Sequence, residues 1–431
     1  MTSPKRIKVG FHVGNESYPT ADTRFPEKGN PGMGGTQFTT IATAYYLDKL
    51  YRDKLEVFIF ANYIDYLPHS LKAFEAIDDI DAAVKSVEQG CEIYIFRSRP
   101  GNHTIYEKLA QLPLKAIARS NNTPDVEGLK AIFNCPTIKR HVCVSREQLD
   151  GLRDHRIFEK STSIYHAFND TMFNSGREIN KTGNTVVYVG SLIHSKGFHI
   201  LAKIWPEIIL KRPDAKLLVI GSGSLYGQSK KQGKWGIAEE NYEADYIRPY
   251  LSDSDGNVID SVKFLGVLGE EKIGILQQAD VGVANPSGFT ETFCSTALEF
   301  QAAGTPVVSA ARGGLLDTVW HGQTGLLGRN PKELKKNILF LLNNPETAKA
   351  FGQSGIRFVR NKFAYEKNAQ HWFSVIVDTY SNKPPRLEKM KDNYFHNYKL
   401  LRECIRITRK SVPLLKDLPS LDEVKTQLRF R

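Results

Sequence analysis

Short runs of Val and Ile alternate with longer amphipathic segments over residues 1–370. This alternation is typical of strand–helix–strand units built around a parallel sheet. A polar, glycine-containing stretch at residues 174–184 separates two groups of such runs, and we interpret it as a linker. The predicted strands are 7–13, 55–60, 92–97, 116–119 and 140–144 in the first group, and 185–190, 215–220, 262–265, 281–284 and 306–309 in the second. The sequence therefore predicts an α/β fold with two parallel sheets.

The length of the chain supports the same division. At 431 residues it exceeds the usual size of one domain, so two domains are expected. The predicted parts are a first domain at 1–174, a second at 185–365, a helix at 366–382 that packs back toward the first domain, and a basic helical tail at 383–431.

Positive charge is concentrated in the tail. The net charge is +11, and residues 383–431 hold 13 Lys and Arg against 6 Asp and Glu. This distribution favours an anionic membrane surface, an acidic partner or simple solubility, and no nucleic-acid-binding motif accompanies it. An amphipathic run at 394–410 is expected to dock on anionic lipid, or alternatively to pack on the chain's own body or mediate self-association. Its cations are Lys399, Arg402, Arg406, Arg409 and Lys410.

Neither a leader nor a cysteine framework is visible in the sequence. No apolar run of 18 residues occurs, and Lys5 and Arg6 lead directly into the first strand. The odd and scattered cysteines lack a Cys-x-x-Cys pair, which argues against disulfides and structural zinc. They are Cys91, Cys135, Cys143, Cys294 and Cys404. We expect a cytoplasmic protein with peripheral contact at the inner face of the membrane.

The most informative stretch follows the predicted strand 281–284. Glu291 is placed where a loop meets a helix that runs until Gly304, and Glu299 lies inside that helix. At about 1.5 Å per residue the two are at most about 12 Å apart, roughly the reach of a sugar-diphosphate-ribose unit. The alternative interpretation is that Glu291 caps the helix and Glu299 lies on a solvated face.

The start of this helix is a candidate anion site. Amides around Phe293, Cys294 and Ser295 are expected at the positive end of the helix dipole. Such a position suits a departing diphosphate.

The pattern Pro-Ser-x3-Glu-x7-Glu at residues 286–299, followed by Ala-Gly-x-Pro-Val at 303–307, resembles the signature of retaining glycosyltransferases of the GT-B fold, family 4. Residues 313–319 and 322–327 are similar to the family's Gly-Gly loop and Gly-x-Thr-Gly turn. Residues 262–267 are similar to its base-binding segment. The resemblance implies two Rossmann-like domains whose parallel sheets face a central cleft, plus a helical C-terminal extension.

The resemblance also implies a donor site. Glu299 is expected to bind the donor ribose, Glu291 and the nearby amides the sugar hydroxyls, and Lys196 the phosphate charge, with Glu291 and Lys196 as the catalytic residues. The implied donor-binding residues are Gly34, Gly35, Ser191, Lys196, Val267, Glu291, Phe293, Cys294, Ser295 and Glu299.

This sequence departs from the family at two places. The family's Gly-Arg-x4-Lys-Gly loop keeps its lysine as Lys196 but has Ser191 at the arginine position, so one cation is missing. Arg97, Arg99 and Arg119 of the first domain are candidates to replace it. The family's histidine after a middle strand is also absent from residues 117–125. The expected acceptor-side residues are Asn121, Asn122 and His12.

The implied activity is transfer of a sugar from a UDP- or GDP-sugar to the hydroxyl of a glycan or lipid-linked acceptor, in polysaccharide or glycoconjugate synthesis. Retention is expected through attack on the face that the diphosphate leaves, without a metal or cofactor and without nucleic acid as a partner. Two alternatives remain. One is an inactive GT-B sugar-nucleotide-binding or scaffold protein, which Ser191 and the absent histidine would suit. The other is a nucleotide-sugar epimerase of similar architecture.

Three further motifs resemble sites of other enzymes. Residues 221–227 are similar to a dinucleotide-binding loop, but the last glycine is one residue late. The Asp-x-Asp pairs at 79–81 and 253–255 are predicted to be solvated loops rather than metal ligands.

Overall fold

The computed structural model describes residues 5–98, 101, 104–173, 181–223 and 231–429. Arg99, linker residues 174–180 and residues 224–227 of the glycine-rich segment lie outside this range. The chain divides into two compact units. Unit 1 comprises Met1–Asn169 and Tyr365–Arg431, and unit 2 comprises Asp170–Ala364.

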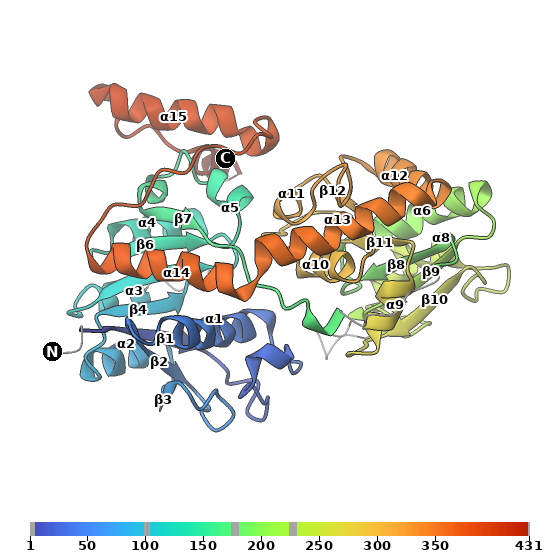
Figure 1. The fold of residues 1–431 in the computed structure, drawn as a ribbon. Coiled ribbons are helices and arrows are strands. Elements are labelled where there is room, and N and C mark those ends of the chain that lie inside the picture. The colour runs from blue at the N-terminus through green and yellow to red at the C-terminus, as the bar shows by residue number, and fades with distance from the viewer. Residues whose placement is uncertain (1–4, 99–100, 102–103, 174–180, 224–230, 430–431) are drawn as a thin grey trace. The chain divides into compact units, whose positions relative to one another are not determined.

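Unit 1 is built on a seven-stranded parallel sheet in the order β3-β2-β1-β4-β5-β6-β7 (Figure 1). Five strands coincide with the predicted Val- and Ile-rich runs. Strands β3 and β7 were not predicted because they are short edge strands without an apolar run, reading Lys-Ala-Phe-Glu and Ser-Thr-Ser. The strands are β1 (Ile7–Val13), β2 (Leu55–Ala61), β3 (Lys72–Glu75), β4 (Ile93–Arg97), β5 (Lys115–Ser120), β6 (Ile138–Cys143) and β7 (Ser161–Ser163).

Helices cover both faces of this sheet, and each face has its own buried apolar cluster. The C-terminal helix α14 completes one cluster. The Tyr46 and Tyr365 rings stack with centroids 4.4 Å apart, and those of Tyr51 and Phe373 stack at 4.0 Å. The helices of unit 1 are α1 (Gly35–Tyr51), α2 (Asp79–Glu88), α3 (Thr104–Leu109), α4 (Val126–Asn134), α5 (Arg146–Asp150), α14 (Tyr365–Tyr380), α15 (Lys399–Ser411) and α16 (Leu421–Arg429), with 3-10 turns at Pro26–Lys28, Arg156–Lys160, His396–Tyr398 and Pro413–Leu415.

Unit 2 has a six-stranded parallel sheet in the order β10-β9-β8-β11-β12-β13. Strand β13 was read from the sequence only as part of a turn. Its Gly325 lies so close to β12 that a Cβ atom would come within 2.1 Å of the Val307 carbonyl oxygen. The strands are β8 (Thr185–Val189), β9 (Lys216–Ile220), β10 (Val262–Gly266), β11 (Val281–Ala284), β12 (Val307–Ala310) and β13 (Gly325–Gly328).

The helices of unit 2 also lie on both faces of their sheet. They are α6 (Phe198–Lys211), α7 (Glu240–Tyr246), α8 (Arg248–Leu251), α9 (Lys272–Gln278), α10 (Ser295–Ala302), α11 (Leu315–Thr318), α12 (Pro331–Asn343) and α13 (Pro345–Phe363), with 3-10 turns at Thr171–Phe173 and His194–Lys196. Two parallel-sheet, Rossmann-like units with a helical C-terminal region confirm the predicted fold class.

Helix α15 packs on unit 1 through its polar face. Lys399 Nζ donates to Glu147 Oε1 at 2.7 Å, and Arg402 Nη1 donates to Asp154 Oδ1 at 2.6 Å. Arg406 pairs with Glu403, Arg409 donates to the backbone carbonyls of Leu418 and Asp154, and Lys410 pairs with Glu159. All five cations expected to face lipid are therefore engaged within unit 1, so the helix packs on the chain's own body.

Among the described residues, no helix is both long enough and apolar enough to cross a membrane.

Candidate functional site

Two loops of unit 2 interlock where β8 and β11 end. Gly197 follows the 3-10 turn after β8, and its φ of +71° is in the left-handed region. A Cβ atom there would lie 2.5 Å from the Ser287 amide nitrogen. Ser287 Oγ donates to the Ser195 carbonyl at 2.8 Å. The lysine loop and the loop after β11 are thus held together at the carboxyl edge of the sheet, where open α/β sheets bind ligands.

The glycine pair after β12 fixes the same loop from another side. The Gly314 amide donates to the Glu291 carbonyl at 2.7 Å. Side chains would not fit: a Cβ on Gly313 would lie 2.3 Å from the Glu291 carbonyl oxygen, and one on Gly314 would lie 2.2 Å from that of Thr292. The Gly-Gly loop recognised in the sequence therefore positions the backbone of Glu291.

Lys196 and Glu291 meet in this interlocked region. Lys196 Nζ donates to Glu291 Oε2 at 2.9 Å, and the Lys196 and Glu291 side chains are 33% and 9% exposed. Asn285 Nδ2 donates to the same carboxylate oxygen at 2.7 Å. The buried Asn285 directly precedes the motif at 286–299, and no role was predicted for it. The only sequence signal for Asn285 is that it lies close to Glu291, a carboxylate expected to face Lys196.

Glu299 lies in α10 and has a different partner. Lys272 Nζ donates to both Glu299 carboxylate oxygens, at 2.9 and 3.0 Å. Lys272 begins α9, shortly after the segment that resembles the base-binding region. Sequence reasoning missed it because nothing in a lone lysine at a helix start indicates which distant carboxylate it reaches.

The three predicted charges act together on Cys294. Burial raises the pKa of the Cys294 thiol, and the Glu291 and Glu299 carboxylates raise it further while Lys196 lowers it. Cys294 is the N-cap of α10, and its side chain makes no capping hydrogen bond. Glu291 is therefore not a helix cap, and the half-buried, ion-paired Glu299 does not lie on a solvated face. The arrangement offers a cation, two carboxylates and a helix N-terminus to one ligand.

The other predicted donor residues differ in exposure. Ser295 and Val267 are exposed, the latter at 59%. Phe293 is buried, with its ring edge-on to that of Phe363 at 5.7 Å. Ser191 is buried, and its carbonyl accepts from the Tyr188 hydroxyl. The Phe293 side chain thus supports the loop from the core, whereas Val267 and Ser295 are accessible.

In unit 1, Gly34 and Gly35 begin α1. Gly34 is its N-cap, and a Cβ atom at Gly35 would meet nothing within 4 Å. Both lie in ordinary backbone conformations, so the helix start leaves open space at Gly35 rather than a strained turn.

A buried polar cluster lies at the carboxyl end of β5. Arg119 donates to Thr40 Oγ1 at 2.7 Å, Thr39 Oγ1 at 3.0 Å and His166 Nδ1 at 2.8 Å. Asn121 Nδ2 lies 3.2 Å from His166 Nε2. Burial, with a smaller contribution from Arg97, lowers the pKa of Arg119 to about 10, and burial beside Arg119 holds the pKa of His166 well below its usual range. A histidine from residues 164–173 thus stands next to the asparagine where the family's histidine is absent.

The remaining acceptor-side predictions fall into two kinds. Asn122 is exposed, whereas His12 is buried and its Nδ1 pairs with the buried Asp79 carboxylate. Asp79 begins α2, so the prediction of a solvated loop was wrong there, because the carboxylate is sequestered by His12. At the second Asp-x-Asp pair, Asp253 Oδ1 accepts from the Asp255 and Asn257 amides, which closes a turn.

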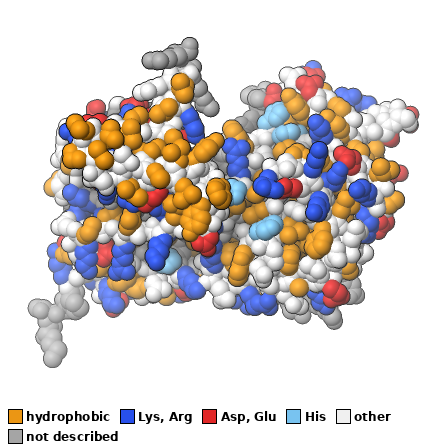
Figure 2. Space-filling model, turned by 90° about the horizontal axis from the view of Figure 1, so that it is seen from above, with side chains coloured by type: hydrophobic (Ala, Val, Ile, Leu, Met, Phe, Trp, Pro, Cys, Tyr) orange, Lys and Arg blue, Asp and Glu red, His pale blue; other side chains and the backbone are white. Residues whose placement is uncertain are grey.

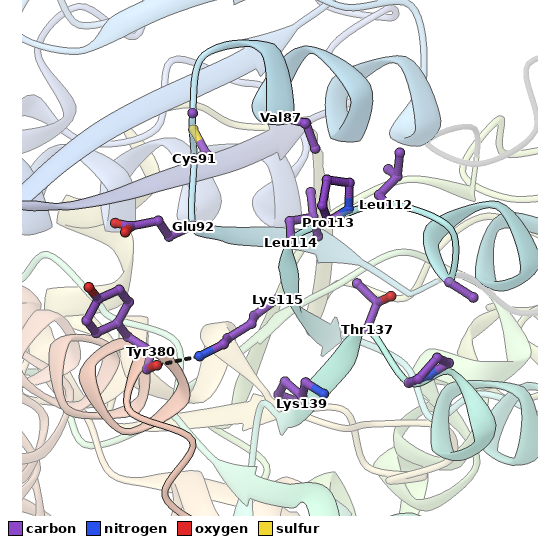
Figure 3. A pocket seen from close by; sticks show the side chains of 13 residues that line it. Val87, Cys91, Glu92, Leu112, Pro113, Leu114, Lys115, Thr137, Lys139 and Tyr380 are labelled. Carbon is purple, nitrogen blue, oxygen red and sulfur yellow. Dashed lines mark hydrogen bonds between the residues drawn. The ribbon is translucent and has the colours of Figure 1, made fainter.

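A hollow of about 660 Å³ in unit 1 lies away from all predicted site residues (Figure 3). Glu92 precedes β4 and Lys115 begins β5, so it opens at the amino-terminal edge of the sheet. Figure 3 shows the Lys115 ammonium directed to the Tyr380 carbonyl. Ligands of open α/β sheets bind at the opposite edge, and we assign this hollow no part in the chemistry.

In the described part of the chain, no group of three or more His, Cys, Asp or Glu side chains is arranged to hold a metal ion.

Residues 173–358 match the family model of glycosyl transferases group 1. D-inositol 3-phosphate glycosyltransferase of Corynebacterium glutamicum is 31% identical over 201 residues, which cover 46% of this chain and 44% of that protein. The chain spans about half the length of the curated relatives it matches.

Solved structures resemble the chain over most of its length. A glycosyltransferase from Rickettsia africae has a TM-score of 0.66 at 16% identity, covering 88% of this chain and 100% of that one. Anabaena HepE in complex with UDP has a TM-score of 0.59 at 14% identity, covering 86% and 100%. At these identities the likeness concerns the fold, and it confirms the GT-B architecture.

Proposed function

Because residues 173–358 match the family model of glycosyl transferases group 1, we propose that the chain transfers a sugar from a nucleotide diphosphate to an acceptor hydroxyl with retention. One observation carries the proposal: the Lys196 ammonium lies 2.9 Å from the Glu291 carboxylate, at the loop that leads into the start of α10. A cation beside helix amides suits a diphosphate, and carboxylates suit the hydroxyls of a sugar and a ribose.

Each group has a distinct role in the proposed complex. Lys196 is partly exposed and forms an ion pair with the diphosphate in the complex. The Glu291 carboxylate can then accept hydrogen bonds from sugar hydroxyls. Asn285 keeps the Glu291 carboxylate in place during this exchange. Glu299 accepts from the ribose, and Lys272 orients it. Val267 is exposed next to β10, where the base would lie.

Retention follows if the acceptor attacks the face that the diphosphate leaves. The departing phosphate oxygen takes the acceptor proton, so the C–O bond to the acceptor forms as the bond to the diphosphate breaks. No side-chain base and no metal are required. Positioning and charge stabilisation by Lys196 and the α10 amides then determine the rate.

On the acceptor side, we assign the direct contact to Asn122, the exposed member of the predicted set. Asn121, held near His166 and Arg119, supports it. The acceptor class is a glycan or lipid-linked hydroxyl in polysaccharide or glycoconjugate synthesis. A solved neighbour of the same fold holds UDP, so UDP-sugars are the first donors to test and GDP-sugars the second.

The test is a panel of UDP- and GDP-sugars screened by thermal shift, followed by donor turnover in the presence of EDTA. We expect one donor to raise the melting temperature and to be hydrolysed slowly without added acceptor. NMR of the first sugar released should show the anomeric configuration of the donor. Lys196→Ala should slow the turnover about 10²-fold.

Other outcomes favour the alternatives. An altered sugar still attached to its nucleotide indicates an epimerase. Donor binding without any turnover indicates a scaffold. Loss of activity in EDTA with recovery on adding Mg²⁺ contradicts the metal-independent mechanism, and an inverted anomer contradicts retention.

A further inference from the structure

Helix α15 turns its apolar side away from the protein. Leu400 and Leu401 are each 49% exposed and Ile407 is 50% exposed. The segments that flank the helix also expose apolar side chains: Phe395 is 92% and Leu414 is 95% exposed. We call Phe395, Leu400, Leu401, Ile407, Leu414 and Leu415 the apolar stripe. Figure 2 looks onto the molecule from above, the side where α15 lies in Figure 1, and hydrophobic side chains gather there.

The polar side of the same helix is held against the rest of unit 1 by buried ion pairs. Lys399 is fully buried and lies within 2.7 Å of Glu147 and 3.2 Å of Asp150. Arg402 is 6% exposed and pairs with the fully buried Asp154. The helix cannot roll over to bury its stripe without separating these buried charges. Exposure of the stripe is therefore built into the packing, and contiguous apolar surface of this kind marks an interaction site.

Charged residues near the apolar stripe indicate what kind of surface binds to it. Lys416 directly follows Leu415, and Lys389 lies on the segment leading to Phe395. Both are exposed and form no ion pair within the described residues, where Asp392 is an exposed acid of the same segment. If a second copy of the chain bound through its own stripe, the positive charges beside the two stripes would be brought together and would repel each other. An anionic lipid surface would instead complement them.

We propose that the apolar stripe of α15 inserts into the interface of an anionic lipid bilayer, with Lys389 and Lys416 contacting the headgroups. The helix would lie in the membrane plane, with its cationic side clamped to unit 1 rather than facing water. This differs from docking through Lys399, Arg402, Arg406, Arg409 and Lys410, which are engaged by the protein.

The chain carries a convenient reporter for the test. Cys404 is exposed on α15, and the other four cysteines are buried. Labelling Cys404 with an environment-sensitive fluorophore therefore reports on the stripe. We expect its emission to shift to the blue, and the protein to co-sediment, with vesicles of phosphatidylcholine mixed with phosphatidylglycerol. Leu400→Glu combined with Ile407→Glu should reduce the bound fraction about tenfold or more.

Ile77 provides the matched control. It is 80% exposed in unit 1 outside the tail, so Ile77→Glu should leave vesicle binding unchanged. A label at Ile77→Cys in a Cys404→Ser background should not shift. Because the substituted side chains are exposed, unchanged melting temperatures are expected and show that the variants fold.

Three results would overturn the proposal. The first is vesicle binding unaffected by the double substitution. The second is equal binding to pure phosphatidylcholine, which removes the role of the cations. The third is no vesicle binding together with a concentration-dependent dimer that the double substitution dissociates, which assigns the stripe to a second copy. The assay needs no turnover, so its result is independent of the proposed transferase activity.

Discussion

Lys196 donates a 2.9 Å hydrogen bond to Glu291, although the two residues are 95 positions apart in the chain. Gly197 against Ser287, and Gly314 against Glu291, hold the two loops in contact. The pair is therefore a product of backbone packing at the sheet edge.

Removing the Lys196 cation should slow the reaction. Lys196→Ala is expected to lower kcat by about 10²-fold because it removes the side-chain charge that faces the diphosphate. Lys196→Arg should recover part of this loss. Lys231 is 78% exposed and pairs with Glu240, so Lys231→Ala is a matched control that should keep full activity. Equal kcat for both alanine variants would exclude the assigned role.

Lys272 should affect donor binding rather than turnover. Without its two hydrogen bonds, the Glu299 carboxylate loses its orientation toward the ribose. Lys272→Ala is expected to raise the KM for the donor about tenfold with kcat nearly unchanged, and Lys272→Arg to restore it. Initial rates at varied donor concentration separate the two parameters. A fall in kcat at unchanged KM would argue against a positioning role.

Gly313 and Gly322 allow backbone strain to be separated from steric conflict. Both have left-handed φ angles, +57° and +74°, so alanine costs about 1–2 kcal/mol at either position. A Cβ at Gly322 meets nothing within 4 Å, whereas one at Gly313 would lie 2.3 Å from the Glu291 carbonyl oxygen. Gly313→Ala should therefore lower the melting temperature more than Gly322→Ala, and it alone should abolish turnover. Similar activities in the two variants would contradict this.

The buried and exposed ion pairs of α15 should contribute unequally. Lys399→Met removes the ammonium shared by Glu147 and Asp150 and is expected to cost about 3–5 kcal/mol of unfolding free energy. Lys410 and Glu159 are both about half exposed, so Lys410→Met should cost at most about 1 kcal/mol. Urea unfolding measures both values, and limited proteolysis should show that the tail is released only in Lys399→Met. Equal losses of unfolding free energy in the two variants would show that the buried ion pairs of Lys399 do not hold α15 on unit 1.

Acid should destabilise unit 1 through His141. Its ring is buried between Ser120 and Ser161, and burial, followed by the charge of His155, lowers its pKa from 6.5 to about 3. Between these values the unfolded chain binds a proton that the folded chain does not. The unfolding free energy should therefore fall as pH drops from about 6.5 toward 3, by up to about 1.4 kcal/mol per pH unit.

Urea unfolding across this pH range measures that slope. His141→Gln should make the slope less steep even if the variant is less stable at neutral pH, while the buried His166, whose pKa is also lowered, keeps a residual slope. The same substitution at the exposed His69 serves as the control and should leave the slope as it is. An unchanged slope in His141→Gln would assign the acid sensitivity to other groups.

Much of the fold follows from local pattern. Buried parallel strands such as β1 and β11 consist mainly of apolar residues, so their positions could be predicted from the sequence. Strands β3 and β7 could not, because edge strands need no apolar run, and neither could β13, whose glycines serve close packing against β12.

The site divides in the same way. The spacing of Glu291 and Glu299 and the position of Lys196 are visible in the sequence because each lies in a motif with fixed local geometry. Asn285, Lys272 and His166 acquire their partners only when separate loops meet. Such partners depend on packing between segments distant in the chain, which a short motif does not encode.

Helix α15 shows which properties the local sequence determines and which it does not. Its periodicity determines by itself that residues near 399–411 form a helix with one cationic and one apolar face. Which face turns inward depends on the acidic groups Glu147, Asp150 and Asp154, which lie about 250 residues earlier in the chain. Local sequence sets the two faces because the helical repeat is local, whereas the tertiary structure decides their orientation because the buried countercharges are not.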